Sequence, residues 1–224
     1  MENAIEQNKH CVFCSEWSNL NLNPLQPFGA KSRIICESRH WYCVPTLGCF
    51  TVGYVLLISK RHRTCIATAS MEEIEDLLCL EKKISDLYKQ IYNSSFICFE
   101  HGVVSPEYTG ANSIGHAHLH MIPSNHDLWE NIMNNGFIRD FFRFNNQGVL
   151  YKYVQEKGIN TYLTFQNLDG KLFLIPDGSN YDSQFFRKVV AEELNCYTAW
   201  NWKKTPCVDN MIRTFNTLTR KQFS

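Results

Sequence analysis

Three histidines alternate with apolar residues near the middle of the chain. Residues 116–122 read HAHLHMI, so one apolar residue separates His116 from His118 and another separates His118 from His120. Successive side chains of a β-strand point to opposite faces of the sheet. The alternation therefore predicts a strand whose apolar face packs on the core while three imidazoles line a cleft. Two alternatives are a surface strand that is rich in histidine without a role, and a three-histidine metal site, although catalytic zinc ligands usually come from separate elements.

The segments around this strand predict an α+β fold. A helix is expected over residues 71–92, because Ser70 and Glu73 have the spacing of a capping box and apolar residues then recur at helical spacing. Segments rich in β-branched and aromatic residues predict strands at 33–38, 41–46, 51–59, 95–100 and 113–122. Three strands, a helix and two more strands indicate an antiparallel sheet with the long helix packed on it.

The composition of the chain changes after Pro123, which predicts a core over residues 1–124 and an extension over 125–224. The extension is expected to be mixed, with a helix over 127–144, a hairpin over 161–176 and amphipathic helices over 183–194 and 206–218. The apolar stripes of the last two helices need a partner surface. We therefore expect the extension to pack on the core, near the cleft.

Charge and composition exclude several classes of protein. The 22 Lys and Arg residues balance 22 Asp and Glu residues, which argues against bulk nucleic-acid binding and against a polybasic membrane anchor. No apolar run approaches the roughly 18 residues of a membrane-spanning helix, and the polar start lacks the apolar stretch of a secretory signal. Several of the ten cysteines lie inside apolar runs, as buried reduced thiols do. We therefore expect a cytoplasmic protein.

Cys11 and Cys14 form a C-x-x-C pair, the one cysteine spacing that suggests a specific role. A redox pair of this type is expected in a βαβ context, which the predicted elements do not provide. Two thiolates combined with two imidazoles form a closed tetrahedral zinc site. Two core cysteines without a metal are the alternative.

The histidine strand resembles the signature of the histidine-triad (HIT) superfamily, His-φ-His-φ-His-φ-φ with φ apolar. The resemblance covers about residues 10–124. Residues 52–62 are similar to the family strand that ends in a proline-lysine-x-histidine turn, with Ser59 in place of the usual proline. Residues 112–115 occupy the place of the polar lead-in to the family's triad. The resemblance implies a HIT-like antiparallel sheet and nucleotide chemistry.

Family members cleave or transfer nucleoside monophosphate groups through a covalent nucleotidyl-histidine. By this resemblance His118 is the nucleophile, and His120 contacts the phosphate oxygens and the leaving group. Ser113 and Asn112 would donate hydrogen bonds to the phosphate, where charge develops in the transition state. A neutral imidazole is a good nucleophile because its unperturbed pKa is about 6.5. We expect a backbone carbonyl to hold the far ring nitrogen of His118 and so leave the attacking nitrogen unprotonated.

The resemblance also implies a structural zinc ion. Family members with an N-terminal C-x-x-C complete the site with the histidine after the lysine-rich turn and with the first triad histidine. In this sequence the ligands would be Cys11, Cys14, His62 and His116.

Histidine at the third triad position is more similar to the hydrolase branches of the family, because the transferase branch usually has glutamine there. We therefore expect a phosphohydrolase that cleaves the α-phosphate bond of a nucleoside phosphoramidate or a (di)nucleoside polyphosphate. A nucleotidyltransferase or phosphorylase acting on a phosphorylated acceptor is the alternative, and a non-catalytic nucleotide-binding module is a third interpretation.

Substrate preference and oligomeric state are less constrained. The acidic residue with which relatives grip the ribose has no counterpart between Trp41 and Tyr54, so the sequence leaves base and sugar preference open. The resemblance suggests a homodimer, although no seam in the sequence is diagnostic of one.

Overall fold

The structure, a computed structural model, describes residues 11–105, 115–134 and 138–221. Its strands are β1 (Cys36–Glu37), β2 (Trp41–Pro45), β3 (Val55–Ser59), β4 (Ser95–Val103), β5 (His118–Ser124), β6 (Phe142–Phe144), β7 (Thr161–Gln166) and β8 (Leu172–Pro176). Its α-helices are α2 (Val12–Ser18), α3 (Met71–Tyr92), α4 (Trp129–Asn134), α5 (Gln147–Lys157), α6 (Phe185–Glu193) and α7 (Val208–Lys221). Within these described ranges, no helix is long and apolar enough to cross a bilayer.

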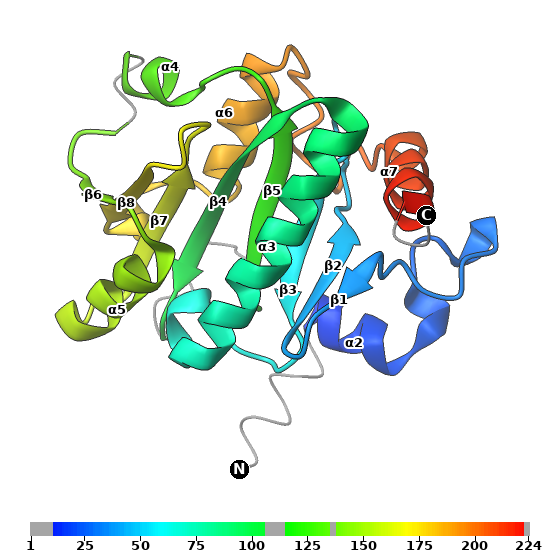
Figure 1. Ribbon diagram of the computed structural model, residues 1–224, viewed down its shortest axis with the longest axis horizontal. Helices are drawn as coiled ribbons and strands as arrows, with labels where there is room; N and C mark the ends of the chain where they lie inside the picture. The colour runs from blue at the N-terminus through cyan, green and yellow to red at the C-terminus, as the bar shows by residue number, and fades with distance from the viewer. Residues whose placement is uncertain (1–10, 106–114, 135–137, 222–224) are drawn as a thin grey trace.

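The strands form one sheet in the order β1-β2-β3-β5-β4-β7-β8-β6. Every neighbouring pair in that order is antiparallel. Helix α3 lies across one face of the sheet and α6 lies behind the other (Figure 1). The predicted α+β class, with an antiparallel sheet and a packed long helix, is confirmed.

Helix α3 begins where the sequence predicts. The backbone N–H of Glu73 donates to Ser70 Oγ at 3.3 Å, and the N–H of Ser70 donates to the Glu73 carboxylate at 2.8 Å. This capping box satisfies two N–H groups that the first turn would leave unpaired. The helix ends at Asn93, whose φ of 48° lies in the left-handed region. The buried stripe of α3 packs in the same core cluster as Leu119 and Met121 of the histidine strand.

The alternation in β5 divides the core. Leu119 and Met121 face α3, whereas Leu56, Ile58 and Phe99 of the neighbouring strands belong to a second buried cluster on the opposite face. Helix α6 covers that second cluster with four buried apolar residues of its own: Phe186, Val189, Val190 and Ala191. The side chains at the even-numbered positions of β5, which include His118 and His120, therefore point to the face of the sheet that α6 covers.

The residues after 124 extend the same sheet. Strand β7 pairs with β4 from Cys98↔Gln166 to Val103↔Thr161, and β8 and β6 follow. The predicted hairpin and the last two predicted helices are present as β7–β8, α6 and α7. The helix predicted over 127–144 was wrong. Of the residues that the structure describes in this range, only the six of α4 are helical, and Phe142–Phe144 forms β6 because it pairs with β8.

Candidate active site and metal cluster

His118 and His120 lie on β5 in the middle of the sheet. In the strand register His118 is opposite Ile58 and His120 is opposite both Leu56 and Phe99. The ring centroids of the two histidines are 4.9 Å apart. The Phe99 ring stacks on His120 at 4.5 Å with an interplanar angle of 14°. The two imidazoles are therefore neighbours on one face and have a rigid aromatic wall beside them.

The protonation of His118 is set by its own strand. Its Nδ1 lies 2.6 Å from the backbone carbonyl oxygen of His116. A carbonyl oxygen only accepts, so Nδ1 carries the ring proton and Nε2 keeps its lone pair. Burial lowers the pKa of His118, which keeps the ring neutral near pH 7. This contact is of the kind expected for a nucleophilic histidine.

His120 has a partner that the sequence did not reveal. Its Nδ1 lies 2.6 Å from the hydroxyl oxygen of Tyr54, which in turn accepts a hydrogen bond from Arg187 Nη1 at 3.0 Å. Burial, together with the neighbouring His118 and the positive charge of Arg187, lowers the pKa of His120 well below its usual value. The sequence does contain a signal that Arg187 is buried. Helical spacing places it on the same face of α6 as the buried residues Phe186 and Val190, where a charged side chain is unusual.

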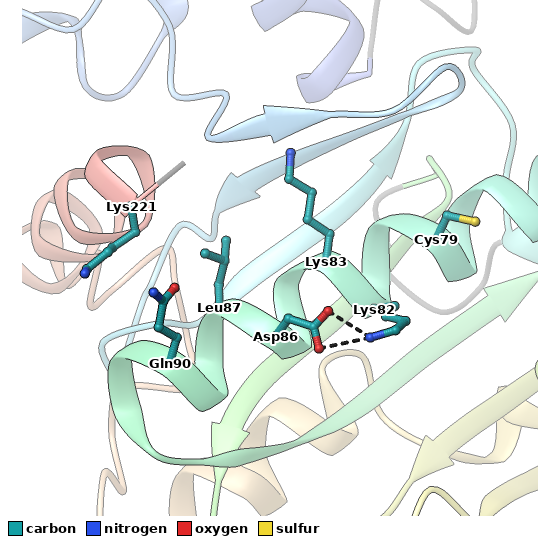
Figure 2. Close-up of a pocket in the computed structure, with 7 residues that line it drawn as sticks. All are labelled: Cys79, Lys82, Lys83, Asp86, Leu87, Gln90 and Lys221. Atoms are coloured by element: carbon teal, nitrogen blue, oxygen red, sulfur yellow. Dashed lines mark hydrogen bonds and ion pairs between the residues drawn. The ribbon is translucent and has the colours of Figure 1, made fainter. Parts of the chain in front are cut away.

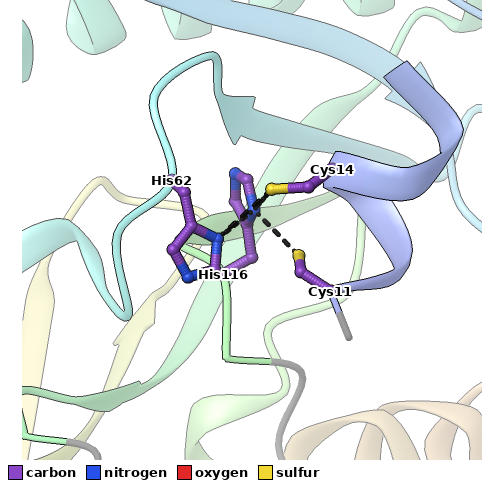
Figure 3. Close-up of side chains that lie close together, drawn as sticks. All are labelled: Cys11, Cys14, His62 and His116. Atoms are coloured by element: carbon purple, nitrogen blue, oxygen red, sulfur yellow. Dashed lines mark hydrogen bonds between the residues drawn. The ribbon is translucent and has the colours of Figure 1, made fainter. Parts of the chain in front are cut away.

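Four potential metal ligands gather beside the start of β5. Cys11 and Cys14 lie at the beginning of α2, His62 follows β3, and His116 precedes β5 (Figure 3). Their ligand atoms all lie within 4.8 Å of one another. His116 Nδ1 is 3.2 Å from Cys11 Sγ and 3.6 Å from Cys14 Sγ. His62 Nδ1 is 3.3 Å from Cys14 Sγ and 3.3 Å from His116 Nδ1.

The four distances of 3.2–3.6 Å are close to the ligand spacing around a tetrahedral ion. Zinc bonds of about 2.3 Å to sulfur and about 2.0 Å to nitrogen place ligand atoms about 3.3–3.8 Å apart. His116 Nε2 lies 2.8 Å from the Ser59 carbonyl oxygen, to which it donates, so the His116 Nδ1 lone pair points into the cluster. Burial raises the pKa of Cys14 to about 12 and lowers the pKa of His116 to about 4. All four residues predicted as ligands are thus brought together.

Two predicted site residues, Asn112 and Ser113, lie outside the described residues. A surface pocket of about 560 Å³ lies away from the site, beside α3 and the end of α7 (Figure 2). Lys82, Lys83 and Lys221 line it, and Lys82 pairs with Asp86 at 2.8 Å. The triad histidines and the four cluster residues do not line this pocket, so it contributes nothing to their chemistry.

No protein-family model and no curated protein matches the chain. Among solved structures 31 chains match. A histidine-triad nucleotide-binding protein from Sulfolobus tokodaii is 17% identical with a TM-score of 0.35, over 45% of this chain and 65% of that one. A zinc-bound histidine-triad protein from Mycobacterium smegmatis is 17% identical with a TM-score of 0.37, over 53% and 78%. Yeast Ap4A phosphorylase is 8% identical with a TM-score of 0.38, over 61% and 58%.

Two of these proteins carry the name of the histidine-triad family that the sequence resembles. The three proteins named above are at most 17% identical to this chain, with TM-scores of at most 0.38, and carry no activity over to it. Its function has to be argued from its own residues.

Proposed function

We propose that this protein is a histidine-triad phosphohydrolase that cleaves the α-phosphate bond of a nucleoside phosphoramidate or a (di)nucleoside polyphosphate. The observation that carries the proposal is the 2.6 Å contact between His118 Nδ1 and the His116 carbonyl oxygen. This contact leaves Nε2 as a neutral nucleophilic nitrogen beside a second imidazole.

The proposed reaction has two steps. Nε2 of His118 attacks the α-phosphorus, a phosphorus–nitrogen bond forms, and the leaving group departs with the electron pair of its bond to phosphorus. A polyphosphate leaves as an anion that a hydrogen bond from His120 stabilises, whereas an amine takes the Nε2 proton of His120 while the phenolic proton of Tyr54 moves to His120 Nδ1. Water then attacks phosphorus, the bond to His118 breaks and returns its electron pair to Nε2, and a nucleoside monophosphate is released. After an amine has left, the water proton restores the His120–Tyr54 pair; after a polyphosphate has left, His120 still holds its proton and the water proton passes to solvent. Asn112 and Ser113 are proposed as further donors to the phosphate.

We also propose that Cys11, Cys14, His62 and His116 hold a zinc ion. The pattern of two thiols and two imidazoles, together with the spacing of their ligand atoms, supports this assignment. With four protein ligands the ion would be structural. It would tie the start of α2 to the loop after β3 and to the residue that supplies the carbonyl for His118.

A nucleotidyltransferase or phosphorylase is the second candidate. The position of Arg187 next to Tyr54 and His120 favours this alternative. Arg187 belongs to the extension after residue 124 and brings a positive charge close to His120, the side proposed for an anionic acceptor. In that reaction a phosphate oxygen of the acceptor replaces water in the second step. The cytoplasmic location and the homodimer stay predictions.

The test starts with a substrate panel. Purified zinc-loaded protein is incubated with nucleoside phosphoramidates and dinucleoside polyphosphates, and the released nucleotides are identified by mass spectrometry. In heavy-oxygen water a hydrolase incorporates the label into the nucleoside monophosphate. With inorganic phosphate added, a phosphorylase instead yields a nucleoside diphosphate, which would replace the hydrolase assignment.

The nucleophile is tested by His118→Asn. Turnover should fall at least about a thousandfold, equivalent to roughly 4 kcal/mol of transition-state stabilisation, with little change in nucleotide binding. His126→Asn, which alters an exposed histidine outside the site, is the matched control. Peptide mapping under non-acidic conditions should find the nucleotide on His118. Near-normal activity of His118→Asn, or an adduct on another residue, would contradict the mechanism.

A further inference from the structure

A chain of hydrogen bonds leads from α6 into the triad. Arg187 Nη1 lies 3.0 Å from the Tyr54 hydroxyl oxygen, which lies 2.6 Å from His120 Nδ1. Tyr54 has no exposed surface and Arg187 is only 4% exposed. The contact therefore connects the part of the chain after residue 124 to the third triad histidine in a buried environment.

The donors and acceptors in this chain can be assigned from chemistry alone. A guanidinium group only donates, so the Tyr54 oxygen accepts from Arg187. The single phenolic proton of Tyr54 then points to His120 Nδ1, the acceptor within reach. In the opposite arrangement His120 Nδ1 would donate to Tyr54. The phenolic oxygen would then accept two hydrogen bonds, and the phenolic proton would have no acceptor among the described residues. His120 is thus neutral with its proton on Nε2.

The position of Arg187 is itself fixed. Its Nε donates to the Trp200 carbonyl at 3.0 Å and its Nη2 donates to the Gly48 carbonyl at 2.8 Å. The guanidinium carbon lies 5.4 Å from the centre of the Phe50 ring and 5.2 Å from that of the Tyr54 ring. Among the ion pairs of the described residues none involves Arg187. Nη1 also lies 3.4 Å from Thr46 Oγ1. The charge is therefore held by carbonyl and hydroxyl oxygens and by aromatic rings, without a carboxylate partner among the described residues.

We propose that Arg187 acts through Tyr54 as a positioning residue that holds neutral His120 in the tautomer with its proton on Nε2. His118 has the opposite tautomer, with its proton on Nδ1. Two histidines on one strand face thereby receive different roles, the first as nucleophile and the second as hydrogen-bond donor to the leaving group. The effect on turnover rests on the proposed function, whereas the tautomer does not.

Nitrogen NMR of histidine-labelled, zinc-loaded protein tests the tautomer without any substrate. In the wild type His120 should be protonated at Nε2 alone. In Tyr54→Phe and Arg187→Met its two nitrogens should shift toward a mixture of tautomers, and Arg187→Lys, which keeps a cationic donor, should retain more of the Nε2–H form. Tyr92→Phe is the matched control, because it removes a buried phenol oxygen with no partner among the described residues. A wild-type His120 protonated at Nδ1, or an unchanged tautomer in both variants, would overturn the proposal.

Leaving-group dependence tests the consequence for turnover. Tyr54→Phe and Arg187→Met should lower kcat about 10- to 100-fold for substrates with a poor leaving group such as an alkylamine, with KM nearly unchanged. For a nitrophenyl nucleotide ester, whose leaving group needs no proton, the loss should be at most about threefold. An equal loss with both substrates would indicate general structural damage and refute the positioning role. If the wild type turns over no nucleotide at all, the proposed function fails while the NMR result still decides the tautomer.

Discussion

Glu81 is a buried carboxyl group on the sheet-facing side of α3, and replacing it with glutamine should change how stability depends on pH. Its side chain accepts a hydrogen bond from Gln147 Nε2 at 2.6 Å, and the residue is 7% exposed. No Lys or Arg forms an ion pair with it among the described residues. Burial therefore dominates and raises the pKa of Glu81 from 4.5 to about 7.

The sign follows from proton linkage. Because the pKa of Glu81 is higher in the folded state, the native protein binds more protons than the unfolded chain between about pH 4.5 and pH 7. The free energy of unfolding should fall as the pH rises through this window and then level off. The rise in pKa from 4.5 to about 7 corresponds to about 3 kcal/mol. Burial also raises the pKa of Glu100 to about 7, so both carboxyl groups make the free energy of unfolding fall over this pH range. Glu81→Gln should remove about half of that decrease.

Urea unfolding at several pH values between about 5 and 8 measures this effect. Relative to the wild type, Glu81→Gln should gain about 2.5 kcal/mol more stability at the upper pH than at the lower one, because part of the titration lies below pH 5. Glu75→Gln, on the exposed face of the same helix, should show no such trend. A stability difference between wild type and Glu81→Gln that is the same at both pH values would refute the reasoning.

Two further predictions concern the metal cluster and the extension. Purified protein should carry about one equivalent of zinc by elemental analysis, and Cys14→Ser should lose most of it and melt at a lower temperature, whereas Cys79→Ser, at an exposed thiol outside the cluster, should keep both. Metal-free wild-type protein of unchanged stability would remove the zinc site. A chain ending at Ser124 should aggregate in size-exclusion chromatography, because β4 would lose its pairing with β7 and expose an unpaired edge. A soluble, fully active fragment would contradict this expectation.

The parts of the fold that the sequence predicted have local causes. The capping box at Ser70 and Glu73 spans four residues, and the two-residue alternation in 116–122 is complete within seven. The continuation of the sheet past residue 124 has no such signal. Strand β7 joins β4 across about sixty residues of chain, and Phe142–Phe144 becomes a strand only because β8 lies beside it. Tertiary pairing decided these elements against local preference.

The site divides in the same way. The spacing of Cys11 and Cys14 is visible locally, but their sulfur atoms meet His62 and His116 across 48 and 105 residues of chain, and only the family resemblance supplied those two histidines. The contact of His118 with the His116 carbonyl lies within one strand and could be expected from the pattern. Tyr54 and Arg187 belong to no motif, so the hydrogen-bond chain to His120 could be found only in three dimensions.

Arg187 also shows why a charged residue can stand on the buried face of α6. Burying a guanidinium group costs several kcal/mol unless its N–H groups are satisfied, and replacing a buried charge with an apolar residue is often neutral or stabilising. The Trp200 and Gly48 carbonyls accept hydrogen bonds from the guanidinium group, so its burial is tolerated. An apolar side chain at this position could give the same stability, so these contacts do not explain why the residue is a cation. The contact that does require a strong donor is the one to the Tyr54 hydroxyl. The position of Arg187 is therefore better explained by the histidine that Tyr54 orients than by the packing of the extension.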